Sequence, residues 1–190
     1  MRAIRPSAHR VMPWRNGGGT TAEIFVEPPS SAGGEPFLYR VSIAAVELDG
    51  PFSRFAGCER HIVLVAGVGM TLDAGSHGRV ELRPFEPARF SGDWDVHGTL
   101  HDGPVRDFNL IVDRSRASSS ITVHATAETR PVDVRPGETC CVHVLEGRIV
   151  GAETGDTLLL DAPCDISPCG PARWIEARVI ARDAGAIRAG

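Results

Sequence analysis

The sequence predicts an all-β protein that folds as two β-barrels within one chain. Short runs rich in Val, Ile, Leu and Phe are separated by turns that share 14 prolines and 21 glycines, which is typical of sandwiches and barrels. No long apolar pattern has the spacing of an α-helix. With 190 residues, 42% of them hydrophobic, the chain can bury one large core or two small ones.

Seven runs are expected to form strands because they are apolar, rich in β-branched residues and bounded by turn residues. The sheets should be closed or covered, since an open sheet leaves edges that pair with other molecules. The expected strands are residues 37–46, 61–67, 105–112, 120–126, 140–147, 156–161 and 173–180.

A weak internal repeat divides the chain. Residues 61–72 (HIVLVAGVGMTL) are similar to residues 141–152 (CVHVLEGRIVGA), and both are followed by a Gly-Asp pair. Between the repeats, residues 114–120 (RSRASSS) have the composition of a linker. We therefore expect an N-terminal barrel over residues 1–115, including a Gly-rich segment, and a C-terminal barrel over residues 116–190.

Composition and charge exclude several classes of function. All twenty basic residues are Arg, the net charge is −4, and no basic patch for a nucleic acid is visible. No stretch reaches the roughly 18 apolar residues of a membrane helix, and the N-terminus lacks the apolar run of a signal peptide. We expect a cytoplasmic protein without a membrane partner. Five cysteines, an odd number, do not suggest a disulfide framework.

The segment Asp133–Gly147 (DVRPGETCCVHVLEG) resembles the first metal-binding motif of cupin barrels, in which His and Glu ligands surround a Pro-Gly turn. The ligand types are absent here. In the C-terminal half the ligand positions hold Asp133, Arg135, Cys140 and Leu158, and in the N-terminal half they hold Ser53, Phe55, Arg60 and Asp95. Because a metal site needs several N, O or S donors that converge on the ion, we expect no metal and no other cofactor, and we assign no catalytic residue.

Arg60 is expected to face the interior of the first barrel. If the former Glu position points inward, strand alternation places Arg60, Ile62 and Leu64 inside and His61 and Val63 outside. A guanidinium inside a barrel is costly unless it is paired. Two partners stay open, the carboxylate of Asp95 and an anionic ligand, because Arg binds carboxylates with two parallel hydrogen bonds.

The Gly-rich segment 12–24 (MPWRNGGGTTAEI) supplies further candidate residues. Three consecutive glycines let a ligand approach the backbone and expose several N–H donors, or they form a plain turn. Trp14, Asn16 and Thr20 flank them with one aromatic and two hydrogen-bonding side chains. These flanking groups favour a ligand site.

The expected strand 105–112 carries polar residues among apolar ones. Alternation puts Val105, Asp107, Asn109 and Ile111 on one face. An Asn among apolar neighbours must find hydrogen-bond partners, so Asn109 either orients a ligand amide or braces a neighbouring turn.

Four phrases of the sequence together resemble motifs of the HutD/Ves family of bicupins. They are PWRNGGGTTAEI (13–24), DGPFSRFAGCER (49–60), FSGDW (90–94) and GPVRDFNLIV (103–112). The resemblance implies two cupin barrels and the binding of a small acid from histidine degradation, such as formylglutamate or urocanate, with a regulatory or protective role. By motif it points to Trp14, Asn16, Thr20, Arg60, Asp107 and Asn109 as site residues.

We therefore expect a protein that binds a small carboxylated metabolite in a metal-free first barrel and has an accessory role in histidine utilisation. Arg60 would clamp the carboxylate, Asn16 and Asn109 would orient the ligand, and Trp14 would form an apolar wall. A homodimer is compatible with the sequence. One alternative is a cupin enzyme that acts on a small acid, either with unconventional metal ligands or as a metal-free isomerase or hydrolase. Another is an interaction module built on the second barrel.

Overall fold

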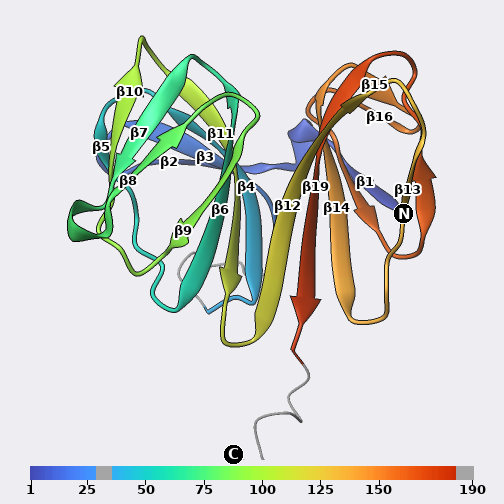
Figure 1. The fold of residues 1–190 in the computed structure, drawn as a ribbon, viewed down its shortest axis with the longest axis horizontal. Helices are drawn as coiled ribbons and strands as arrows, with labels where there is room; N and C mark the ends of the chain where they lie inside the picture. The colour runs from blue at the N-terminus through green and yellow to red at the C-terminus, as the bar shows by residue number, and fades with distance from the viewer. Residues whose placement is uncertain (29–35, 183–190) are drawn as a thin grey trace, which may run out of the picture. The chain divides into compact units, whose positions relative to one another are not determined.

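The computed structural model describes residues 1–28 and 36–182, and the chain forms two compact units (Figure 1). The N-terminal unit is Arg10–Ser115, and the C-terminal unit combines Met1–His9 with the chain from Arg116 onward. The described residues contain strands and two short 3-10 helices, Pro6–Ala8 (η1) and Gly75–His77 (η2), and no α-helix. The all-β prediction is confirmed. None of the described helices is long and apolar enough to cross a membrane.

The N-terminal unit consists of two antiparallel sheets. Its strands are β2 (Arg10–Pro13), β3 (Gly19–Glu27), β4 (Tyr39–Val46), β5 (Gly50–Pro51), β6 (Cys58–Ala66), β7 (Gly69–Asp73), β8 (Arg79–Leu82), β9 (Pro87–Ser91), β10 (His97–His101) and β11 (Val105–Asp113). One sheet has the order β2-β3-β4-β11-β6-β9, and the other has the order β5-β10-β7-β8.

The core of the N-terminal unit fixes the direction of Arg60. Ile62 and Leu64 of β6 are fully buried and belong to one apolar cluster with Met70 of β7. Because side chains alternate along a strand, Arg60 projects from the same face as Ile62 and Leu64, as predicted. His61, expected to face outward, lies on the other face but is also buried.

The C-terminal unit has one larger sheet and two strand pairs. Its strands are β1 (Arg2–Ile4), β12 (Ala117–Thr126), β13 (Arg130–Val132), β14 (Glu138–Glu146), β15 (Arg148–Ile149), β16 (Ala152–Glu153), β17 (Thr157–Leu160), β18 (Cys164–Ile166) and β19 (Ala172–Ala181). The larger sheet has the order β1-β17-β14-β19-β12, while β13 pairs with β18 and β15 with β16. Its core includes Cys140, Val142, Val144, Leu158 and Trp174.

The first nine residues differ from the predicted division, which assigned residues 1–115 to the first barrel. β1 pairs antiparallel with β17 of the C-terminal unit, with Arg2 opposite Leu159. Ile4 is buried, and Arg5 forms an ion pair with the buried carboxylate of Asp156. Backbone pairing and this ion pair hold the N-terminal strand in the C-terminal unit, and a strand of three residues has no sequence pattern that would reveal its partner.

Candidate functional site

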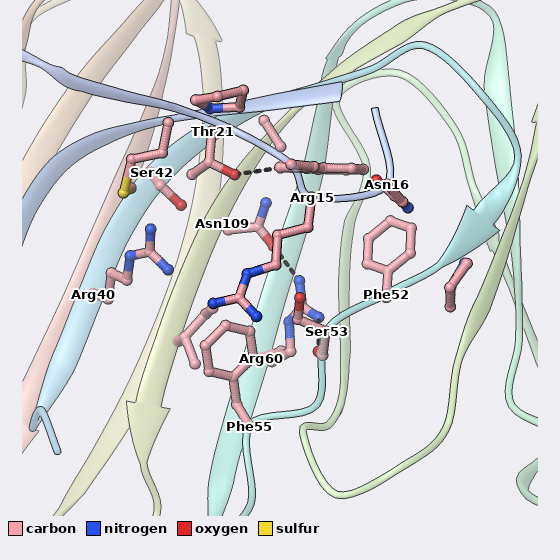
Figure 2. Close-up of a pocket in the computed structure, with 16 residues that line it drawn as sticks. Arg15, Asn16, Thr21, Arg40, Ser42, Phe52, Ser53, Phe55, Arg60 and Asn109 are labelled. Atoms are coloured by element: carbon pink, nitrogen blue, oxygen red, sulfur yellow. Dashed lines mark hydrogen bonds between the residues drawn. The ribbon is translucent and has the colours of Figure 1, made fainter. Parts of the chain in front are cut away.

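The N-terminal unit contains a cavity of about 500 Å³ that the inner face of the larger sheet lines (Figure 2). Strand register explains which side chains reach it. Asn109 of β11 lies opposite Ser42 of β4, and Ile111 lies between Arg40 of β4 and Arg60 of β6. All of these side chains therefore project from one face. The segments before β3 and before β6 complete the lining, with Trp14, Arg15, Asn16, Phe52, Ser53 and Phe55.

Arg60 is the buried cation of this cavity, only 5% exposed. Its Nη1 donates to the backbone oxygen of Ser53 at 3.2 Å, and its Nη2 donates to Asn109 Oδ1 at 2.9 Å. Its Nε is buried and has no hydrogen-bond partner. Both partners are neutral, so no carboxylate directly compensates the guanidinium charge.

Three aromatic rings surround this guanidinium. Its central carbon lies 5.4 Å from the ring centre of Phe52, 5.4 Å from that of Phe55 and 4.9 Å from that of Phe90. The negative face of an aromatic ring attracts a cation. Burial lowers the pKa of Arg60 to about 10, against the opposite influence of Asp107. Arg60 therefore keeps its charge at neutral pH.

Asp107 lies two residues before Asn109 on the same face of β11 and is fully buried. Its Oδ1 accepts a hydrogen bond from Asn109 Nδ2, while its Oδ2 is buried without a partner. Burial raises the pKa of Asp107 to about 7, although the charge of Arg60 and the hydrogen bond from Asn109 act to lower it. Asp107, Asn109 and Arg60 thus form one chain of hydrogen bonds that leads to the cavity.

Two more arginines line the cavity, and they differ in pairing. Arg40 Nε lies 2.8 Å from Glu23 Oε2, and Glu23 also lies 3.3 Å from Arg10. Arg15 is exposed, and within the described part of the chain it has no ion-pair partner. Figure 2 shows its guanidinium pointing into the cavity, near Phe55. The cavity is therefore positively charged at its rim as well as at its base.

Trp14 and Asn16 flank the mouth of the cavity. Trp14 Nε1 donates to Thr21 Oγ1 at 2.8 Å, and the indole ring meets Phe52 edge-to-face at 6.5 Å. These contacts leave the Trp14 ring as an apolar wall of the cavity. Asn16 Oδ1 accepts from the Gly18 N–H at 3.1 Å, which fixes the turn before β3.

The three glycines serve this turn and do not present a row of free donors. Gly17 has a φ of +71°, a conformation that favours glycine, and its N–H donates to the Trp14 carbonyl. A Cβ on Gly19 would lie 2.2 Å from the Ala45 carbonyl oxygen. Because the N–H groups of Gly17 and Gly18 are used within the turn, the plain-turn alternative holds for these two donors.

The structure brings together most of the predicted site residues. Arg60, Asn109, Trp14 and Asn16 line one cavity, and Asp107 joins it through Asn109. Thr20 lies outside the lining, because it pairs with Ala45, whereas Thr21 pairs with Ala44 on the cavity face.

Of the two partners left open for Arg60, the carboxylate of Asp95 is not the one that the structure places beside it. The Asp95 side chain is 85% exposed and lies 3.4 Å from Arg54. The assignment of Asp95 to a ligand position assumes that the loop after β9 follows the path it takes in a metal-binding cupin. Sequence reasoning also missed Arg40 and assigned no role to Arg15. The alternation of Arg40, Ser42 and Ala44 along β4 would have indicated Arg40 once the pairing with β11 was known.

The positions that hold the metal in cupins do not fit a metal in this chain. Ser53, Phe55 and Arg60 do converge on the cavity, but Arg60 brings a positive charge and Phe55 brings no donor atom. Among residues 1–28 and 36–182, no three His, Cys, Asp or Glu side chains are grouped to hold a metal ion. A divalent cation would therefore face a guanidinium instead of a ligand set.

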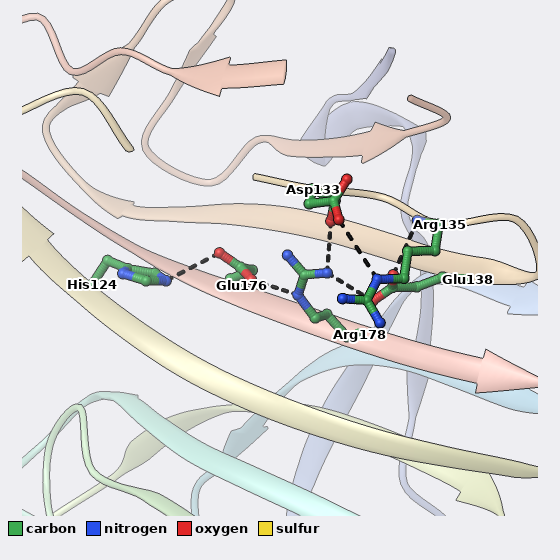
Figure 3. A network of polar contacts seen from close by, with 6 residues as sticks. All are labelled: His124, Asp133, Arg135, Glu138, Glu176 and Arg178. Atoms are coloured by element: carbon green, nitrogen blue, oxygen red, sulfur yellow. Dashed lines mark hydrogen bonds and ion pairs between the residues drawn. The ribbon is translucent and has the colours of Figure 1, made fainter. Parts of the chain in front are cut away.

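The C-terminal unit arranges its charges differently (Figure 3). Arg178 of β19 donates to Glu138 Oε1 at 2.7 Å and to Glu176 Oε1 at 2.6 Å, and Glu176 also contacts His124 Nε2 at 3.1 Å. Burial lowers the pKa of Arg178, but its hydrogen bonds to the two carboxylates raise it above its usual value. This network is internally satisfied.

The remaining cupin positions of the C-terminal unit form no site. Asp133 and Arg135 are exposed and lie 3.6 Å apart as an ion pair. Cys140 is fully buried in the apolar core, and burial raises the pKa of its thiol. Neither the exposed pair nor the neutral buried thiol resembles the ligand set of a metal.

Fold and site together define a bicupin protein in which a basic cavity takes the place of a metal centre. The HutD family model matches residues 6–167, and the chain belongs to this family. HutD from Pseudomonas fluorescens SBW25 is 32% identical, with a TM-score of 0.79 over 95% of this chain and 98% of that one. A conserved protein of unknown function from Pseudomonas aeruginosa PAO1 is 28% identical, with a TM-score of 0.85 over 94% and 98%.

A curated relative lies in a histidine-utilisation locus. The uncharacterized 21.2 kDa protein in the hutC 3′ region of Pseudomonas putida is 41% identical over 111 residues, which are 58% of this chain and 57% of that protein. The match thus spans little more than half of the relative. The bacterial pirin YhhW of Escherichia coli shares the fold alone, at 10% identity and a TM-score of 0.68 over 95% of this chain and 98% of that one. The prediction of a bicupin is confirmed.

Proposed function

We propose that this HutD-family protein binds a small carboxylated metabolite in the cavity of the N-terminal unit, without a metal, and serves histidine utilisation in an accessory role. The observation that carries the proposal is Arg60, a buried cation whose hydrogen-bond partners are neutral and whose Nε–H is unpartnered. A carboxylate beside it would supply both the missing charge and the missing acceptor.

The walls of the cavity suit a small organic acid. Trp14, Phe52 and Phe55 offer apolar surface for a carbon skeleton, while Arg15 offers a second cation at the rim. A volume of about 500 Å³ is in the range of small-molecule sites. Arg40 contributes less to binding because Glu23 already compensates its charge.

The relatives support the choice of ligands to test. One relative is HutD itself and another lies beside hutC, so acids of histidine degradation, such as formylglutamate and urocanate, are the first candidates. Regulation of the pathway by the bound acid is the accessory role that we propose.

The test is a thermal-shift screen with these acids on three proteins. The wild type should be stabilised, by about 2.7 kcal/mol at a ligand concentration of one hundred times Kd. Arg60→Met keeps an unbranched apolar chain at this position and removes the charge, so the thermal shift caused by the acids should vanish. Arg79→Met is the matched control, because Arg79 on β8 is exposed and pairs with Asp73 outside the cavity.

Folding of the Arg60 variant needs its own check, since its loss leaves Asp107 buried without a nearby cation. The double variant Arg60→Met/Asp107→Asn removes both charges together and should fold. An unchanged thermal shift in either Arg60 variant would contradict the proposal.

A further inference from the structure

Asp107 is a buried carboxyl group that the binding of an anion does not use directly. It does not line the cavity, but its Oδ1 holds the amide of Asn109, and the other end of that amide holds Arg60. Asn109 therefore points its oxygen at Arg60 because its nitrogen is committed to Asp107. Asp107 Oδ2 is buried and has no hydrogen-bond partner, so a negative charge on this carboxyl group is only partly compensated and the neutral form is favoured.

Few other charged groups surround Asp107. Its neighbours across the sheet are Ala44 of β4 and Leu64 of β6, which belong to the apolar core together with Met70 of the facing sheet. The charged groups on the same face are Arg60 of β6, Arg40 of β4, Glu23 of β3 and Arg10 of β2. Cys58 of β6 is a thiol that burial keeps neutral, and its pKa is raised.

One histidine is close to Arg60 in sequence but does not lie on the sheet face that carries Asp107. His61 follows Arg60 in β6 and projects to the opposite face of the sheet. Arg40 and Glu23 form their own ion pair. The charge at the buried end of the anion site is therefore set mainly by Arg60 and Asp107, and Arg15 adds a cation at the exposed rim.

These two groups make the charge of the site depend on one proton. With Asp107 ionised, the pair Arg60–Asp107 is neutral overall; with Asp107 protonated, the pair carries one positive charge. An anion beside Arg60 repels an ionised Asp107 and so favours its protonated form. We propose that Asp107 takes up a proton when an anion binds beside Arg60, so that ligand binding and proton uptake are coupled. This inference rests on the proposed function.

The coupling predicts how affinity changes with pH. Asp107 has a pKa of about 7 before binding, and an anion would raise it further. If the pKa rises by about one unit, the ligand binds about five- to tenfold more weakly at pH 8.5 than at pH 6, and about 0.4 proton is taken up per ligand at pH 7.

The experiment is isothermal titration calorimetry with N-formyl-L-glutamate, whose carboxylates stay ionised from pH 6 upward. Titrations at pH 6, 7 and 8.5 at fixed ionic strength give the affinities. At pH 7, buffers of different ionisation enthalpy give the number of protons taken up. Asp107→Asn mimics the protonated acid and can still accept from Asn109, so it should bind tightly at all three pH values without proton uptake.

A direct readout uses the protein without ligand. The carboxyl carbon of Asp107, followed by NMR, should titrate near pH 7 and shift to higher pH when N-formyl-L-glutamate is added. Equal wild-type affinity at pH 6 and 8.5, or weak binding by Asp107→Asn at every pH, would overturn the coupling and leave the proposed function standing. If urocanate and N-formyl-L-glutamate both fail to bind the wild type at any pH, the proposed function and the coupling fall together.

Discussion

In the N-terminal unit Ile111 of β11 lies opposite Arg60 of β6, and in the C-terminal unit Arg178 of β19 lies opposite Cys140 of β14. Both strand pairs also carry a register shift at the same end, near Arg106 in one and near Val144 in the other. Each unit thus places one arginine on the inner face of equivalent strands, but on opposite members of the pair.

The partners of the two arginines explain what each can do. Arg178 donates to two carboxylates, those of Glu138 and Glu176, so its charge is already compensated. Arg60 donates to an amide and a backbone carbonyl, so its charge remains for a ligand. At the position where β11 has Asn109, β19 has Glu176. Two carboxylates therefore close the network around Arg178, whereas the amide of Asn109, at the position of Glu176, leaves the charge of Arg60 open.

A second difference between the units lies two residues earlier on β11 and on β19. Asp107 lies opposite Leu64, and Trp174 lies opposite Val144, so an indole takes the place of the buried carboxyl group. Trp174 is fully buried and belongs to the C-terminal core. The N-terminal unit keeps polar groups where the C-terminal unit packs its largest side chain.

The largest expected effect tests this packing. Trp174→Ala should lower the free energy of unfolding by about 3 to 5 kcal/mol, because it removes a fully buried aromatic side chain. Urea denaturation followed by circular dichroism measures the loss. Ile180→Ala on the same strand, where the side chain is 50% exposed, is the control and should cost less than about 1 kcal/mol. Equal losses in the two variants would contradict the assigned packing.

The next prediction concerns stability and pH. Asp107 has a pKa of about 7 in the folded state, against a usual 3.8. Between these values the folded state keeps a proton that the unfolded state releases, so the stability due to this group falls as pH rises from about 4 to 7. The Asp107→Asn variant has no titrating group at this position, so it does not lose stability in this way as pH rises. Its stability relative to wild type should rise by roughly 4 kcal/mol between pH 4 and pH 8, as measured by urea denaturation across that range.

Glu138 in the C-terminal unit provides a contrast of opposite sign. Burial raises its pKa, but hydrogen bonds from Arg178 and from the Arg135 N–H outweigh burial and hold it below the usual value. The stability that ionised Glu138 contributes to the folded state is present above its usual pKa and is lost as pH falls. The stability that Glu138→Gln loses relative to wild type should therefore shrink toward low pH. The same trend in the Asp107 and Glu138 variants would refute the distinction between the units.

The smallest expected effect comes from a substitution that makes the surroundings of Arg60 resemble those of Arg178 in the C-terminal unit. Asn109→Asp places a carboxylate beside Arg60, as Glu176 lies beside Arg178. Asp107 and the new carboxyl would share one proton, leaving Arg60 compensated even at pH 6. The affinity for N-formyl-L-glutamate should fall about tenfold, or about 1.4 kcal/mol. Asn16→Asp at the exposed rim should cost less, because water screens it; calorimetry distinguishes the two.

Arg60 and Asn109 could be placed from sequence because alternation along a strand is local. The contact between Arg60 and Asn109 could not be predicted, because it depends on the pairing of β11 with β6 and because the loop after β9 carries Asp95 outward. Thr21, and not Thr20, lines the cavity for a similar reason, since the register of β3 against β4 decides which residue faces inward. Pairing between distant segments was the missing information in each case.

The pairing of β1 with β17 has a practical consequence for anyone who wishes to isolate one half. A fragment beginning at Arg116 would lack Arg2–Ile4 and would leave the backbone groups of β17 unsatisfied at an open border, inviting association between copies. A fragment covering Arg10–Ser115 keeps all the strands of its own unit. The N-terminal unit, which holds the cavity, is therefore the one that can be produced as a separate fragment without loss of a strand.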